Sequence, residues 1–393
     1  MNIVIEVFLK RVWWQQVVLV QLIALVGIQF AGTIGTKYLV PRFGWGESHN
    51  VTAGGGSDDT LEGRFARWDS NYYLRIAQRG YTSEGGDVVF FPLYPLLISL
   101  LHNALGLSLL WSGWIVAVTC YFGAGLLLYQ LIRTDHSAEL ALWGVVWLSI
   151  FPTAFFFTSL YTESLFILTS IAALYFAGRG QFTLSGLAIA FAGATRPTAF
   201  LLAIPFFVEV WQFRRLGQIR SADALLGTLI APAGVMAFYL HLVATVGDGN
   251  IIGLYSSTAL VLFERNLALP WETFSDALKA AVFAKGFTQV IARHDLAFAL
   301  TGMASAVFGL FHLRQSMALY FLAGMIFLFS NHGPAGLPFL SIPRYVAALF
   351  PLYLVLAIVT TKMPKQLRWL PVLVSVCFLG ILSAWFATGR WVA

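Results

Sequence analysis

Charged residues are scarce in this chain. Only 11% of its 393 residues are charged, 59% are hydrophobic, and the mean hydropathy is +0.77. Apolar runs recur that are longer than the roughly 20 residues needed to cross the hydrocarbon core of a bilayer. This composition excludes a soluble domain and predicts an all-α polytopic membrane protein.

Cysteine is also nearly absent. Cys120 and Cys377 both lie inside apolar runs and lack the paired spacing of a zinc site or a disulfide framework. We therefore interpret them as packing residues. Lys10 and Arg11 precede an apolar run that is too long for a signal-peptide core, which predicts a retained first span with the N-terminus in the cytoplasm.

Metal and phosphate motifs are weak. The glycine-rich stretch TAGGGSDD near residue 55 does not follow a strand, so it is not a phosphate-binding fingerprint. Asp58 and Asp59 with His49 could bind a cation, but their spacing favours a solvated loop. We expect no metal and no cofactor.

Eleven or so spans fit the apolar runs. They lie near residues 12–34, 109–132, 141–158, 161–177, 182–196, 197–213, 223–246, 293–313, 317–331, 342–361 and 369–388. With a cytoplasmic N-terminus, the short inside loops collect the basic residues, as the positive-inside rule requires. The net charge of +6 is spread over these loops. This distribution indicates a role in membrane orientation and in binding anionic ligands, and it does not favour nucleic acid as a partner.

The segment 90–107 is apolar but is not expected to cross. A crossing there would invert every later helix and export two basic loops. Pro92 and Pro95 interrupt its start, and the remaining dozen residues suit a half-embedded helix. Residues 35–108 then form one external loop and ledge, and 246–294 form a second external region in which Pro270 opens a short amphipathic helix.

Ionisable and aromatic side chains from five segments are predicted to gather on the external face. An arginine or acid near a helix centre costs about 2.5–3.5 kcal/mol on insertion scales, so such residues usually face a cavity or an anionic ligand. The candidates are Asp69, Tyr161, Glu163, Arg196, His332 and Arg344, with Trp68, Tyr72 and Tyr73 beside Asp69.

Each candidate has a structural alternative. Asp69 could begin a helix and pair with Arg67 or Arg75, Glu163 could cap a helix hairpin, and His332 could belong to a structural turn. Arg196, before Pro197, and Arg344, after Pro343, could merely extend their side chains to the membrane–water interface. The aromatic residues could serve only in packing.

Sugar transfer from a lipid phosphate needs this set of groups. The departing phosphate is acidic enough to leave unprotonated, so no second acid of the kind that hydrolases use is required. Asp69 would act as the general base on the attacking hydroxyl. Arg196 or Arg344 would stabilise the charge that grows on the phosphate.

Several strings of the chain resemble one family. RWDSNYYLRIAQRGY, FFPLYP, FPTAFFFTSLYTESLF and GATRPTAFLL, in this order, are similar to the family of the second mannosyltransferase of GPI-anchor synthesis and its prokaryotic relatives. The resemblance is specific over about residues 64–205 and thins beyond, to VGDGN near 246 and IPRYVAALFPLYL near 342. Pro197, after the arginine of the fourth string, departs from the eukaryotic pattern.

The resemblance implies a GT-C glycosyltransferase, with residues 1–393 as a single transmembrane domain. It implies that Asp69 is the catalytic carboxylate of the first external loop, that Glu163 and Arg196 line the site, and that no metal is required. The donor would be a polyprenyl (dolichyl-type) phosphate mannose, the acceptor a lipid or glycolipid hydroxyl, and the configuration would invert. FFPLYP and the short loops suggest a prokaryotic plasma membrane with the active site outside.

Two alternatives stay open at this point. A lipid-linked-sugar transporter or flippase would place polar residues through the whole bilayer and show paired halves, and neither feature is evident. A non-catalytic scaffold whose first loop binds a partner is the other.

Overall fold

The computed structural model describes residues 12–39, 60–82, 86–247, 250, 253–258 and 264–392. Its first part contains α2 (Trp13–Ile34), η1 (Gly35–Leu39), α4 (Leu61–Arg64), α5 (Ser70–Arg79), η2 (Asp87–Val89) and α6 (Leu93–Leu105). Its middle contains α7 (Leu109–Arg133), α8 (Ala138–Ile150), η3 (Ala154–Thr158), α9 (Glu163–Ala177), α10 (Phe182–Gly193), η4 (Pro197–Leu202), α11 (Ala203–Arg215), α12 (Ser221–Ile230) and α13 (Ala233–Val246). Its last part contains β1 (Asn266–Leu267), α15 (Pro270–Phe283), α16 (Gly286–His312), α17 (Gln315–Ser330), β2 (Asn331–His332), α18 (Ile342–Ala347), α19 (Pro351–Lys362) and α20 (Trp369–Ala387).

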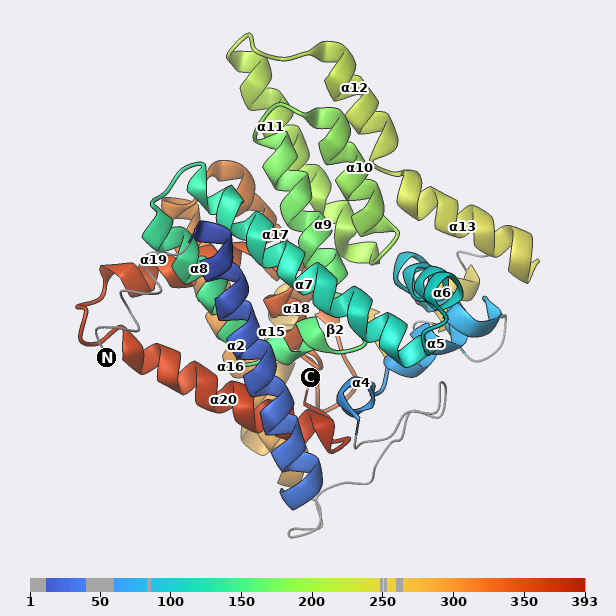
Figure 1. Cartoon of the computed structure of the whole chain (residues 1–393), viewed down its shortest axis with the longest axis vertical. Helices are drawn as coiled ribbons and strands as arrows, with labels where there is room; N and C mark the ends of the chain where they lie inside the picture. Colours follow the sequence, from blue (N-terminus) through green and yellow to red (C-terminus); the bar gives the residue numbers. More distant parts are fainter. Residues whose placement is uncertain are drawn as a thin grey trace.

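The helical class predicted from the composition is confirmed. Five helical stretches are long and apolar enough to cross a membrane: Trp13–Leu39, Leu109–Arg133, Ser221–Val246, Gly286–His312 and Trp369–Ala387. Six shorter apolar helices accompany them in the described part of the chain. The protein is thus an integral multi-pass membrane protein, and the number of about 11 spans stays a prediction. In Figure 1, α9 to α12 extend upward, while α2, α16 and α20 occupy the lower half.

Prolines break three of the predicted spans. The predicted span 141–158 is α-helical only to Ile150, because Pro152 follows. The predicted span 197–213 begins as the 3-10 turn η4, and the predicted span 342–361 is divided into α18 and α19 ahead of Pro351. Proline lacks the N–H that a continuing helix needs and clashes with the preceding turn, which explains each break.

These breaks have a consequence for function. Non-helical backbone at membrane depth is tolerated only where it is buried in protein or lines a cavity. Three buried ionisable residues lie at helix starts near such irregular backbone: Glu163 opens α9, Arg196 precedes η4, and Arg344 lies in the first turn of α18.

Contacts join the described elements of the segment that follows the first span, residues 60–82 and 86–108. Tyr72 stacks on Phe90 with ring centroids 4.3 Å apart, and Arg75 Nε donates to Asp87 Oδ1 over 2.8 Å. α6 has 13 residues, about 20 Å at 1.5 Å per residue, which is short of a 30 Å hydrocarbon core. This length agrees with the half-embedded helix expected for residues 90–107, and its place at the membrane stays a prediction.

Two smaller predictions also meet the structure. The amphipathic helix expected from Pro270 is present as α15. Of the two cysteines, Cys120 is buried as expected, whereas Cys377 is exposed on α20, so the packing interpretation is wrong for Cys377.

Candidate active site

A chain of buried ion pairs joins four distant segments. Arg344 Nη1 donates to Asp69 Oδ2 over 2.8 Å, and Arg344 Nε lies 2.9 Å from Glu163 Oε1. Arg196 Nη2 bonds the same Glu163 oxygen, and Arg196 Nε donates to Thr162 Oγ1 over 3.0 Å. The structure therefore brings together four of the ionisable residues that the sequence singled out, and their formal charges cancel.

Asp69 lies at the N-cap position of α5, as the helix-start alternative expected. Its side chain makes no capping hydrogen bond there and points to Arg344 instead. The two arginines proposed as its local partners have other contacts: Arg67 Nη2 donates to the Ala387 carbonyl over 2.5 Å, and Arg75 pairs with Asp87. Asp69 Oδ1 accepts no hydrogen bond from the described residues, so it is available to a ligand.

Glu163 is fully buried between the two arginines. Its Oε1 serves both guanidinium groups, while its Oε2 is buried and has no hydrogen-bond partner among the described residues. A buried carboxylate oxygen without a donor is costly, so Glu163 is held in place at a free-energy cost to the fold.

Arg196 does not line the cavity that contains Asp69. Its backbone is extended, as expected for a residue before proline. Its side chain lines a separate cavity of only about 20 Å³, together with Phe166 and Tyr320. Glu163 already neutralises Arg196. Arg196 therefore holds Glu163 in place within the chain of buried ion pairs and adds no charge to the cavity beside Asp69.

The cavity beside Asp69 has a volume of about 220 Å³. It is lined by Asp69, Glu264, Arg265, Pro334, Leu340, Ser341, Arg344, Tyr345 and Trp391. Glu264 is exposed, so solvent screens its charge. The other charged groups of the lining are partly or fully buried, and they bring one carboxylate and two guanidinium groups to the same small space.

Arg265 was not predicted from the sequence. Its guanidinium lies 5.0 Å from the centroid of the Tyr345 ring, and its Nη2 donates to the Leu340 carbonyl over 2.7 Å. Within the described ranges it forms no ion pair within 4.0 Å, unlike Arg196 and Arg344. Arg265 therefore has charge available for an anionic ligand. It lies in the segment 246–294 that the sequence predicts to be external, between Glu264 and Asn266, and no motif marks it.

Backbone strain surrounds this cavity. In the part of the chain that the structure describes, three non-glycine residues have positive φ: Trp68 at 50°, Glu264 at 49° and Ser341 at 66°. Glu264 and Ser341 line the cavity, and Trp68 directly precedes Asp69. Such conformations cost about 1–3 kcal/mol each and cluster at functional sites. The strain supports a functional role for this cavity.

The predicted aromatic residues mainly pack. Tyr161 is buried with its ring 5.1 Å from the Arg344 guanidinium. Tyr73 packs edge-on against Phe90, and burial raises its pKa. Burial likewise raises the pKa of Tyr72, which stacks on Phe90. Trp68 packs edge-on against Trp391 at 5.1 Å.

His332 lies beside this cavity, since its strand partner Asn266 directly follows Arg265, but it does not line it. It belongs to β2, which pairs antiparallel with β1, and its Nε2 is 3.4 Å from Asp276 Oδ2 on α15. The pKa of Asp276 is lowered, first by the hydrogen bond from Lys279 and also by the one from His332. His332 is not part of the cavity lining, so the geometry favours its structural alternative.

Metal ligands do not gather in the described ranges, where no three His, Cys, Asp or Glu side chains form a cluster. His49, Asp58 and Asp59, the weak candidates for a cation site, lie outside the described residues.

Known structures of low similarity were found over most of the chain. The Archaeoglobus fulgidus oligosaccharyltransferase complexed with Zn and sulfate aligns with a TM-score of 0.48 and 12% identity, over 94% of this chain and 53% of that one. ArnT from Cupriavidus metallidurans in the apo state aligns with a TM-score of 0.46 and 12% identity, over 84% of this chain and 71% of that one.

Sequence relatives give a family. GPI mannosyltransferase 2 of Drosophila melanogaster is 29% identical over 119 residues, which are 28% of this chain and 26% of the relative. GPI mannosyltransferase 2 of Yarrowia lipolytica (strain CLIB 122 / E 150) is 26% identical over 180 residues, 45% of this chain and 50% of the relative. The chain thus matches half or less of the length of these curated relatives.

The family model described as mannosyltransferase (PIG-V) matches residues 18–242. This range contains Asp69, Glu163 and Arg196, whereas Arg265 and Arg344 lie beyond it. Since the match spans more than half of the 393 residues, the chain belongs to the mannosyltransferase (PIG-V) family.

Proposed function

We propose that the protein transfers mannose from a polyprenyl-phosphate mannose donor to a hydroxyl of a lipid or glycolipid acceptor. One observation carries the proposal: Asp69 and Arg265 line the same small, strained cavity, and Arg344 ties Asp69 to the buried Glu163. Membership in the mannosyltransferase (PIG-V) family supports the sugar, and a phosphate donor fits the surplus guanidinium.

Asp69 is the general base in this proposal. The acceptor oxygen attacks the anomeric carbon, the bond from that carbon to the phosphate oxygen breaks, and its electron pair leaves with the polyprenyl phosphate. The acceptor proton passes to Asp69 Oδ1, which accepts no other hydrogen bond from the described residues. Attack opposite to the departing phosphate inverts the anomeric configuration, and no step calls for a metal.

Arg344 positions the base. It contacts both Asp69 and Glu163, so it fixes the direction of the Asp69 carboxylate from a buried, rigid start of α18. Arg265 contacts the phosphate, because its charge is not already neutralised by an ion pair. Arg196 holds Glu163 in place. The roles expected for Arg196 and Arg344 as phosphate ligands thereby pass to Arg265.

The site faces the outside in this proposal. Helices that begin at the site end in basic residues: α11 ends at Arg214 and Arg215, and α19 ends at Lys362. Basic residues favour the cytoplasmic side of short loops, which leaves the opposite end, with Asp69, on the external face.

A flippase would need a polar path through the bilayer. The cavity beside Asp69 is small, and the larger cavity next to it is lined almost entirely by apolar side chains. This arrangement favours transfer over transport.

The test uses the full chain purified into lipid nanodiscs. Incubated with a synthetic polyprenyl-phosphate mannose and a membrane lipid extract, it should form a mannosylated product with inverted configuration, measured by mass spectrometry and NMR. Passage of the intact donor across a sealed vesicle without any mannosylated product would favour the flippase.

A further inference from the structure

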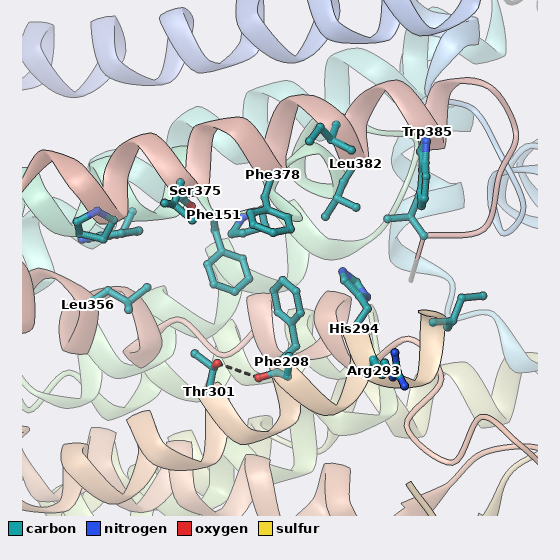
Figure 2. Close-up of a pocket in the computed structure, with 18 of the residues that line it drawn as sticks. Phe151, Arg293, His294, Phe298, Thr301, Leu356, Ser375, Phe378, Leu382 and Trp385 are labelled. Carbon is teal, nitrogen blue, oxygen red and sulfur yellow. Dashed lines mark hydrogen bonds between the residues drawn. The ribbon is translucent and has the colours of Figure 1, made fainter. Parts of the chain in front are cut away.

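A second, much larger cavity of about 960 Å³ lies between α16, α19 and α20. Figure 2 shows its walls: α20 contributes Ser375, Phe378, Leu382 and Trp385, and α16 contributes Phe298 and Thr301. Its lining on α20 runs from Leu370 to Trp385, about 22 Å at 1.5 Å per residue. That length is most of a hydrocarbon core about 30 Å thick.

Among the described residues, the side chains that line the middle of this cavity leave no polar group without a partner. Its three hydroxyl groups are used within the protein: Ser375 donates to the Ile150 carbonyl, Thr301 to the Ala297 carbonyl and Thr360 to the Leu356 carbonyl. The rest of the middle is aliphatic and aromatic. A polar ligand would find no partner there, whereas a hydrocarbon chain would find only hydrocarbon.

One end of the cavity is polar. Figure 2 shows Arg293 and His294 at the end where Trp385 lies. His294 Nε2 is buried and has no hydrogen-bond partner among the described residues. The indole nitrogen of Trp391 is also buried and also has no such partner. Unsatisfied buried nitrogens are rare in proteins, so these two point to a ligand with polar atoms at this end.

Trp391 joins this end to the candidate active site. Its side chain lines both the apolar cavity and the cavity that contains Asp69 and Arg265. A molecule with its head at Asp69 and a long apolar tail would pass Trp391 and continue along α20. Ile381 and Val374 are 54% and 48% exposed, so the cavity is open along α20 and a chain can enter from the bilayer.

We propose that the apolar cavity holds the isoprenoid chain of the sugar donor, with the phosphate at the Trp391 end beside Arg265. The inference rests on the proposed function and adds the place of the lipid. A cavity of about 150 Å³ holds one benzene molecule, so this one holds roughly six times as many carbon atoms, or about seven isoprene units. Affinity should therefore rise with chain length and level off near that length.

The test uses the enzyme in nanodiscs and compares two mannosyl phosphate donors. One donor carries a lipid of two isoprene units, and the other carries a full-length polyprenyl lipid. Ala297→Trp fills the cavity from α16, and Ile381→Trp fills it from α20. Ala304→Trp is the matched control, since Ala304 is exposed on α16 one heptad farther on and outside the cavity lining.

We expect the wild-type enzyme to prefer the long-chain donor. In both cavity variants this preference should fall about tenfold, because KM for the long-chain donor rises, and in Ala304→Trp it should be unchanged. Retained preference in both cavity variants, or an equal loss in the control, overturns the inference. So does a tightly bound phospholipid that full-length polyprenyl phosphate fails to displace. An absence of turnover with either donor in the wild type instead contradicts the proposed function.

Discussion

Arg265 gives the most discriminating prediction about the donor. Replacing it with glutamine removes the guanidinium from the cavity wall while keeping a shorter, uncharged polar side chain. Hydrogen bonds to charged groups contribute about 1.5–3 kcal/mol. Since 1.36 kcal/mol is tenfold in rate, kcat/KM for the donor should fall about 10- to 150-fold.

The same substitution also has a structural cost, which must be separated from the loss of binding. Arg265 contacts the Tyr345 ring and the Leu340 carbonyl. A cation–π contact contributes about 0.5–1 kcal/mol where it is exposed, and a hydrogen bond about 0.5–1.5 kcal/mol. Thermal unfolding should therefore show a loss of about 1–2.5 kcal/mol, too small to abolish folding.

Arg179→Gln is the matched control. Arg179 lies 3.7 Å above the Tyr175 ring, so the variant removes a similar arginine–tyrosine contact beyond the end of α9, away from the cavity. Arg265→Lys should be intermediate, since lysine keeps the charge but not the planar fork. The reasoning is refuted if Arg265→Gln keeps the wild-type kcat/KM, or loses no more of it than Arg179→Gln does.

Three further substitutions test the buried network and its limits. Glu163→Gln leaves two buried arginines without their shared carboxylate and should cost about 3–5 kcal/mol of unfolding free energy, whereas Glu139→Gln breaks an exposed pair with Arg368 and should cost about 1 kcal/mol or less. Equal losses would contradict the account. His332→Gln should change stability by about 0.5 kcal/mol or less and leave kcat/KM unchanged; a large fall in kcat would return His332 to the site.

Local signals predicted much of the architecture. Apolar runs marked the spans, and Pro270 marked the start of α15. The effect of proline inside an apolar run was underestimated: Pro152, Pro197 and Pro351 each end or restart a helix within a predicted span. Hydropathy measures transfer into lipid, but it does not record the missing N–H of proline.

Part of the candidate site was also predictable. The sequence indicates four of its residues because each carries a charge next to an apolar run, where burial in the membrane costs free energy: Asp69, Glu163, Arg196 and Arg344. Which of them pair could not be inferred, since Asp69 and Arg344 are 275 residues apart and meet only through helix packing. Local spacing pointed to Arg67 or Arg75 instead.

Arg265 and the apolar cavity were not predictable for a related reason. No local pattern distinguishes Arg265 until Tyr345 and Leu340 are brought against it. The cavity arises where α16, α19 and α20 fail to fill the space between them, and their separate sequences resemble those of any apolar helix. Packing of distant segments decides both features.

Mannosyl transfer by Asp69→Asn is the most direct test of the central claim. The isosteric amide keeps the shape of the side chain but cannot take the proton from the acceptor. We predict that the purified variant stays folded, because Arg344 keeps its ion pair with Glu163, and that it forms no mannosylated product, while Asp276→Asn, an acid on α15 outside the cavity, keeps the wild-type rate. Full turnover by Asp69→Asn would show that Asp69 is not the base.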